Sequence, residues 1–301
     1  MTFSVVLCDP NAAEGPRLGV AVASKFLAAG AVVPSARAGV GAVATQAMAN
    51  LRYPGQVLEL LASGMTVEDA VRTVTGADDQ AMHRQLTVVD AAGRSAAYTG
   101  AECLDWAGDA CGPGFAVAGN VLTGANVIEE MTRIAQSVVT ESEVSLARRL
   151  LAVLAAGDAV GGDRRGRQSA GLLVVGAGAG YGGGSDVAVD LRVDDHGDPV
   201  RELHRLLGIH ELLFGRPEQL LPLEGDVALR LQQALVTLGY LPEGIEILQS
   251  SDSALLERAA LERALLEAAG MENLEERLVS GSIDPVVLAY LEDLANDQLR
   301  A

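Results

Sequence analysis

Two nearly continuous apolar segments at the start of the chain constrain its fold most strongly. Residues 3–8 and 17–23 are predicted to be β-strands, joined by a turn at Asp9-Pro10-Asn11. Neither segment alternates apolar with polar side chains, so both faces of their sheet are expected to be covered. Aromatic residues make up only 3% of the chain, so the buried layers must consist mainly of small aliphatic side chains.

The pattern after these strands predicts layered sheets with helices outside them. A long hairpin tip is expected at 176–184, and a boundary near 215–222 leads into an acidic, all-helical tail. Further strands are expected at residues 31–33, 40–45, 85–90, 95–98, 115–118, 170–175 and 187–193. Helices are expected at 55–63, from a capping signal at Thr66 onward, and at 126–138, 143–155 and 199–214.

Composition excludes several classes of partner. The 301-residue chain has a formal net charge of −18, which would repel a nucleic-acid backbone. It shows no secretory signal and no apolar run of membrane-spanning length, so we expect a soluble, cytoplasmic protein without a membrane partner. Its three scattered cysteines argue against a disulfide framework and a zinc cluster. We expect no cofactor and no metal.

Thr2 stands at the start of the first predicted strand. Threonine is small enough for methionine aminopeptidase to remove Met1 before it, which would leave a hydroxyl nucleophile and a free α-amine on one residue. An unperturbed α-amine has a pKa of about 7.7–8.0 and can accept the hydroxyl proton. Most chains that begin Met-Thr make no use of this pair, so the rest of the sequence decides whether it matters.

Polar residues follow several otherwise apolar strands. If strands 3–8, 17–23 and 40–45 lie side by side, these residues share an edge with Thr2. A buried Lys25 there would lower the pKa of the α-amine, and side-chain amides could donate to an oxyanion. An ordinary polar strand end is the alternative for each of them. The residues are Ser24 and Lys25, Gln46 and Asn50, and Asn120.

Three further segments have both a functional and a structural interpretation. The arginines at 164, 165 and 167 could grip a carboxylate or phosphate, or pair with the acidic surface. The glycine loop 176–182 precedes a strand rather than a helix, which favours a hairpin tip over a dinucleotide site. The acidic cluster with His196 at 194–198 is typical of a solvated turn more often than of a cation site.

Several motifs occur in order along the first two thirds of the chain. They are residues 1–4, 18–26, 38–47, 105–108, 162–170 and 191–196. In these motifs the chain resembles DUF1028, a family of unknown function, over about residues 1–213. The resemblance implies an α+β fold, a four-layer αββα sandwich like that of N-terminal-nucleophile (Ntn) hydrolases. It implies hydrolysis of an amide or related C–N bond, and we assign this domain to residues 1–215.

The tail, assigned to residues 222–301, resembles helical domains named for peptidoglycan binding. The similarity lies in residues 226–240, 273–277 and 283–287. Two roles stay open for this small all-α domain: packing or oligomerisation, with a homodimer expected, and binding of a glycan or peptide.

These observations lead to two main hypotheses. In the first, Thr2 attacks the carbonyl of a small metabolite or peptide after Met1 removal. In the second, the same fold binds a small molecule or peptide without catalysis, and a scaffold that only self-associates is a third option. For the first, the catalytic candidates are Thr2, Ser24, Lys25 and Asn50, and the substrate-binding candidates are Gln46, Asn120, Asp163, Arg165, Arg167 and Gln168.

Overall fold

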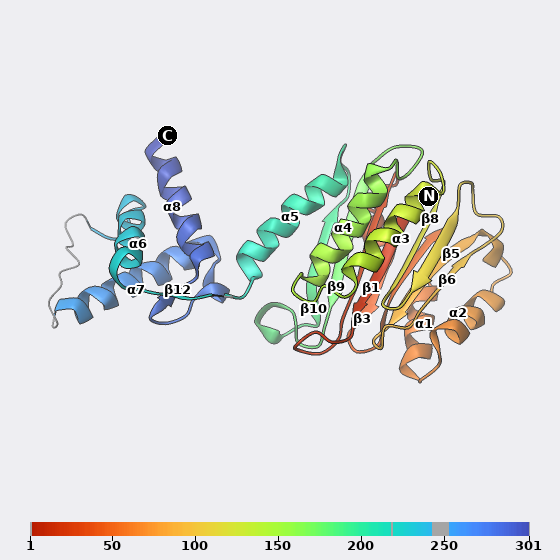
Figure 1. Cartoon of the computed structure of the whole chain (residues 1–301), viewed down its shortest axis with the longest axis horizontal. Coiled ribbons are helices and arrows are strands. Elements are labelled where there is room, and N and C mark those ends of the chain that lie inside the picture. Colours follow the sequence, from red (N-terminus) through yellow and green to blue (C-terminus); the bar gives the residue numbers. More distant parts are fainter. Residues whose placement is uncertain (1, 218, 243–252, 301) are drawn as a thin grey trace. The chain divides into compact units, whose positions relative to one another are not determined.

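The computed structural model describes residues 2–217, 219–242 and 253–300 (Figure 1). The chain divides into two compact units, the first ending at Leu207 and the second beginning at Gly208. The predicted domain limits, 1–215 and 222–301, stay a prediction. Met1 and residue 218 of the expected linker lie outside the described residues. No helix in the described part of the chain is long and apolar enough to cross a membrane.

The first unit contains a six-stranded sheet in the order β10-β9-β2-β1-β8-β7, in which all neighbours are antiparallel. Its central strand β1 has β2 on one edge and β8 on the other. The strands are β1 (Thr2–Asp9), β2 (Arg17–Ser24), β7 (Gly108–Gly112), β8 (Phe115–Asn120), β9 (Ser169–Val175) and β10 (Val187–Val193).

A second, four-stranded antiparallel sheet faces the first. Its order is β3-β4-β5-β6, and its strands are β3 (Pro34–Arg37), β4 (Gly41–Ala47), β5 (Arg84–Asp90) and β6 (Ser95–Thr99). Helices α3 and α4 cover the first sheet, and α1 and α2 cover the second (Figure 1). Their bounds are α1 (Tyr53–Ala62), α2 (Val67–Gly76), α3 (Asn126–Val138) and α4 (Leu146–Ala159). The predicted four-layer αββα class is therefore confirmed.

The side chains of β1 show how one strand serves two layers. Phe3, Val5 and Leu7 pack in the apolar cluster beneath α3 and α4. Val6 and Cys8 pack in the cluster between the two sheets. Because strand residues alternate in direction, Thr2 and Ser4 belong to the face that meets the second sheet. The nearly continuous apolar sequence of β1 reflects burial on both faces.

Some sequence predictions differ from the structure. The strand expected at 31–33 is wrong, because the backbone forms a 3₁₀ turn, η1 (Ala29–Ala31), and Val33 N bonds to Ala29 O. Strand 40–45 does not lie beside 3–8, because β2 and β8 occupy both edges of β1, and β4 belongs to the facing sheet. The short, glycine-bounded strand β7 was not predicted from the sequence.

The second unit is small and mainly helical, as predicted. Helix α5 (Pro199–Phe214) begins in the first unit and ends in the second, and it precedes α6 (Gly225–Thr237), α7 (Ser253–Glu272) and α8 (Pro285–Arg300). Leucine and alanine side chains from α6, α7 and α8 form one apolar cluster. The side chains of Arg277 and Asp284 form a buried ion pair beside it.

Candidate functional site

Thr2 and Ser24 meet at one end of the first sheet. In the register of β1 with β2, Phe3 pairs with Ala23, so the neighbouring residues Thr2 and Ser24 approach each other. The Oγ1 atom of Thr2 lies 3.1 Å from the Oγ atom of Ser24, and the two residues are only 4% and 2% exposed. A hydroxyl pair that sequence reasoning placed on one sheet edge is thus within hydrogen-bonding distance.

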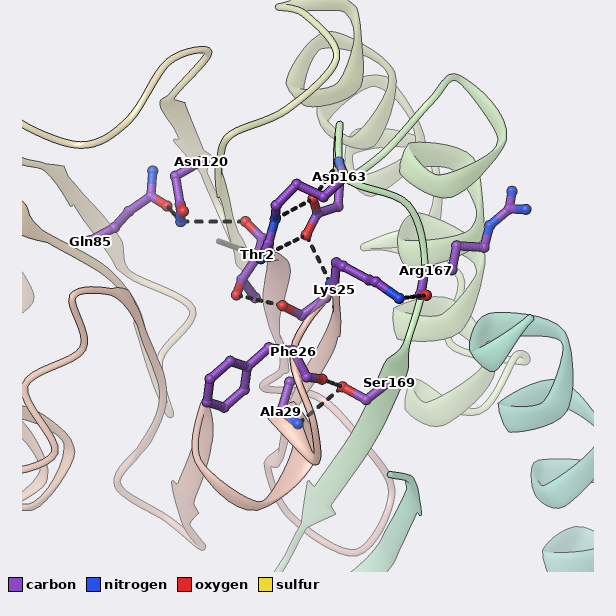
Figure 2. A network of polar contacts seen from close by, with 11 residues as sticks. Thr2, Lys25, Phe26, Ala29, Gln85, Asn120, Asp163, Arg167 and Ser169 are labelled. Atoms are coloured by element: carbon purple, nitrogen blue, oxygen red, sulfur yellow. Dashed lines mark hydrogen bonds and ion pairs between the residues drawn. The ribbon is translucent and has the colours of Figure 1, made fainter. Parts of the chain in front are cut away.

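A chain of buried amides continues from Thr2 into the space between the sheets. Asn120, at the end of β8, donates from Nδ2 to Thr2 O at 3.5 Å and to Gln85 Oε1 at 2.9 Å (Figure 2). Gln46 Nε2 donates to the same Gln85 oxygen at 2.7 Å. Ser4 Oγ in turn donates to Gln46 Oε1 at 2.7 Å. The network joins strands of both sheets at the end where Thr2 lies.

Gln85 is the residue of this network that sequence reasoning missed. Its Nε2 atom donates to the backbone carbonyls of Gly119 and Gly108 at 2.9 and 3.1 Å, and the residue is fully buried. The available signal was a glutamine at the start of an otherwise apolar strand, comparable to the position of Gln46 directly after strand 40–45.

Lys25 does not have the buried position that was expected. It is the first residue after β2 and is exposed, and its Nζ atom donates to Arg167 O at 3.3 Å (Figure 2). Its backbone N–H donates to Asp163 Oδ2 at 2.8 Å. The expected burial is wrong because β2 ends at Ser24, and the described contacts give no support for the lysine amine lowering the pKa of a Thr2 amine.

The carboxylate of Asp163 fixes the loop beside Lys25. Besides the Lys25 N–H, it accepts from the backbone N–H of Arg165 and from its guanidinium, with Nη2 to Oδ2 at 2.8 Å. Asp163 is 5% exposed, whereas the side chain of Arg165 is 31% exposed, so a buried carboxylate is paired with a partly solvated guanidinium. These contacts give Asp163 and Arg165 a structural role in the loop.

Arg167 and Gln168 also have partners within the protein. The Arg167 Nε atom donates to both oxygens of Asp158, at 2.8 and 3.1 Å, and this hydrogen-bonded carboxylate raises the pKa of the arginine. Gln168 Nε2 donates to Asp195 Oδ1 at 3.1 Å. Of the predicted substrate-binding cations, Arg165 and Arg167 are therefore both paired with aspartates.

Asn50 belongs to a separate polar cluster. Its Nδ2 atom donates to Asp78 Oδ2 at 2.9 Å, and Tyr53 and Arg84 donate to the same oxygen. The Asn50 side chain, a backbone N–H and the other donors together lower the pKa of Asp78 well below its usual value. No described contact joins Asn50 to Thr2, so the structure does not bring these two candidates together.

A pocket of about 450 Å³ opens beside Ser24. Phe3 and Ser24 line it, together with the loop that carries Asp163 and Arg164. Its size suits a small organic molecule. In the described residues, no group of three or more His, Cys, Asp or Glu side chains is arranged to hold a metal ion.

The sequence of the first unit matches the family model described as "Family of unknown function (DUF1028)" over residues 2–203. The chain belongs to the DUF1028 family. A crystal structure of a DUF1028 protein from Silicibacter pomeroyi is 30% identical to it, with a TM-score of 0.61. The match covers 75% of this chain and 91% of that chain.

Other comparisons extend to the tail and to a more distant structure. Residues 212–291 match the family model described as "Putative peptidoglycan binding domain". Anbu (ancestral beta-subunit) from Yersinia bercovieri is 13% identical, with a TM-score of 0.32 over 69% of this chain and 94% of that chain. No curated protein matches the DUF1028 chain.

Proposed function

We propose that this DUF1028 protein is an amidohydrolase that uses Thr2 as an N-terminal nucleophile once Met1 has been removed. Its substrate is a small metabolite or peptide with an amide or carbamoyl C–N bond. The observation that carries the proposal is the position of Thr2, which begins a central strand with its hydroxyl 3.1 Å from that of Ser24. An N-terminal threonine there would combine a nucleophile and a base.

In the proposed reaction, Thr2 Oγ1 attacks the carbonyl carbon while the Thr2 α-amine accepts the hydroxyl proton, directly or through water. The C–N bond then breaks, and the leaving nitrogen takes this proton and departs as an amine. Water adds to the remaining Thr2 ester and passes a proton to the α-amine. The carboxylic acid leaves as the proton returns to Oγ1.

Two neighbours of Thr2 have distinct roles in this proposal. Ser24 holds the Thr2 hydroxyl in one rotamer through the contact between the two oxygens. Asn120 takes the role of amide donor beside the reacting carbonyl, supported by its contact with Thr2 O. Asn50 is omitted because its amide donates to Asp78 in a separate cluster, and no described contact joins it to Thr2.

Intact mass and two substitutions at Thr2 test the proposal. The active enzyme should have lost the mass of Met1, and Thr2→Ala should lower turnover of N-acyl or N-carbamoyl substrates by at least about 10³-fold. Thr2→Ser keeps a hydroxyl and should retain activity. Circular dichroism should show that both variants are folded. Full turnover by a chain that retains Met1 would end this mechanism.

A second candidate function is ligand binding without catalysis. The exposed side chain of Lys25 favours it, because the cation expected to activate the nucleophile contacts Arg167 O instead. A binding protein should retain its ligand affinity after Thr2→Val and should show no turnover in either form. Loss of binding in that variant would count against this alternative.

For the helical unit we propose self-association of the chain as a homodimer, with glycan or peptide binding as its alternative. The match at 212–291 supports the alternative. Light scattering across a tenfold range of protein concentration tests the homodimer, because a molar mass that stays at that of the monomer would exclude it. Pull-down with insoluble peptidoglycan tests the second role.

A further inference from the structure

One arginine of the cluster at 164–167 differs from the other two. Arg165 pairs with Asp163, and Arg167 pairs with Asp158. Arg164 lines the same pocket and is exposed, and no carboxylate among the described residues lies within ion-pair distance of it. Since both neighbouring cations are neutralised, Arg164 supplies the uncompensated positive charge of the pocket.

The backbone that carries Arg164 is held in place by neighbouring segments. Arg164 N donates to Val121 O at 2.9 Å, and Asp163 forms an isolated bridge with Leu122. Gly161 has a φ of +124°, and a Cβ atom there would lie 2.3 Å from Thr123 Oγ1. A backbone fixed on both sides gives its side chain a defined starting point, which lowers the entropic cost of binding a ligand.

The pocket also borders the residue that contacts the proposed nucleophile. Ser24 lines it, and the hydroxyl of Ser24 is 3.1 Å from that of Thr2. A ligand in this pocket can therefore place one group against Arg164 and another near Thr2. On a chain with a net charge of −18, an anionic ligand needs such a local cation to offset the general repulsion.

We propose that Arg164 binds the carboxylate of the substrate, and that the substrates are N-acyl or N-carbamoyl amino acids. The planar guanidinium can donate two parallel hydrogen bonds to a carboxylate, which fixes the orientation of the adjoining amide. This inference deepens the proposed function and rests on it for the reaction. Of the three arginines for which the sequence suggested this role, it selects Arg164 rather than Arg165 or Arg167.

The test compares charged and neutral forms of the same compounds. A panel of N-acetyl amino acids and their C-terminal amides is titrated calorimetrically against the full chain, with inorganic phosphate as a competitor. The wild-type chain should bind at least one acid about tenfold or more tightly than its amide. Arg164→Gln should abolish that preference, and Arg164→Lys should restore part of it.

Arg263→Gln is the matched control, because it removes the same charge from an exposed arginine of the helical unit. It should leave the preference unchanged. A wild-type chain that binds no acid more tightly than its amide overturns the inference, as does an unchanged preference in Arg164→Gln. Binding of phosphate alone would show an anion site of another kind and would also overturn it.

Thr2→Val separates this inference from the proposed function. Retained acid binding with loss of turnover supports both. If the Met1-processed wild type binds the acid through Arg164 but shows no turnover, the anion site is supported and the proposed hydrolase activity is wrong. If turnover depends on Thr2 but not on substrate charge or on Arg164, the proposed hydrolase activity is supported and the anion site is wrong.

Discussion

Replacing Gln85 with methionine is expected to lower the free energy of unfolding of the first unit by about 2–3 kcal/mol. Methionine is similar in length but has no amide, so Gln46 Nε2 and Asn120 Nδ2 lose an acceptor at 2.7 and 2.9 Å. Each buried donor that loses this acceptor costs about 1–3 kcal/mol, with the lower figure for Asn120, which keeps its contact with Thr2 O. The added apolar surface offsets about 1–2 kcal/mol of the total.

Urea denaturation followed by tryptophan fluorescence measures this loss. Trp106 is the only tryptophan and lies in the first unit, so the signal reports that unit. Gln136→Met is the matched control, because Gln136 is exposed on α3 and its replacement should change stability by less than about 0.5 kcal/mol. A Gln85→Met chain as stable as this control, with an unchanged denaturant slope, would refute the reasoning.

The double variant tests whether the amides act as one network. Gln46→Met and Gln85→Met remove opposite ends of one hydrogen bond. The sum of the losses in free energy of unfolding in the two single variants should therefore exceed the loss in the double variant by about 1 kcal/mol. Strict additivity would mean that the two side chains are energetically independent. The 2.7 Å contact would then contribute nothing measurable.

Three other outcomes follow from buried or hydrogen-bonded groups. Arg149→Met leaves a buried aspartate without its ion-pair partner and should cost about 3–5 kcal/mol by urea denaturation. Burial raises the pKa of Cys8 to about 12, so a thiol reagent at pH 8 should modify exposed Cys111 and leave Cys8 unmodified until the protein unfolds. The Asn50 amide and other donors lower the pKa of Asp78. The wild-type chain should therefore be more stable than Asp78→Asn, by the full difference above about pH 4 and by less as the pH falls below it. A difference in stability that is constant with pH would contradict this.

Local pattern was sufficient to predict much of the layered fold. Helix α3 and strand β10 begin and end where periodicity places them, because each combines a clear apolar repeat with a distinct boundary. The meeting of Thr2 with Ser24 follows from two adjacent antiparallel strands of equal length, which bring the start of one to the end of the other. These features depend on residues close in sequence or on a single hairpin.

Pairing between distant strands was not determined by the pattern. An apolar strand buried on both faces shows that layers cover it, but not whether its neighbour lies beside it or across from it. For this reason β4 was expected beside β1, although it faces β1 from the second sheet. The same ambiguity concealed Gln85, whose role depends on Gln46 and Asn120 reaching it from different strands.

The distribution of polar residues between the sheets is itself an argument for a functional site. Val6, Cys8 and Val20 belong to an apolar cluster that fills this interface farther from the Thr2 end. Thr2 and Ser4 lie on the same face of β1 at its start. Four buried polar side chains of other strands lie at the same end: Ser24, Gln46, Gln85 and Asn120. An apolar interface would avoid the need to pair each of these groups, since buried polar atoms cost free energy unless each finds a partner. Their concentration at one end, beside a pocket with an unpaired arginine, is the kind of local conflict with packing that marks a functional site.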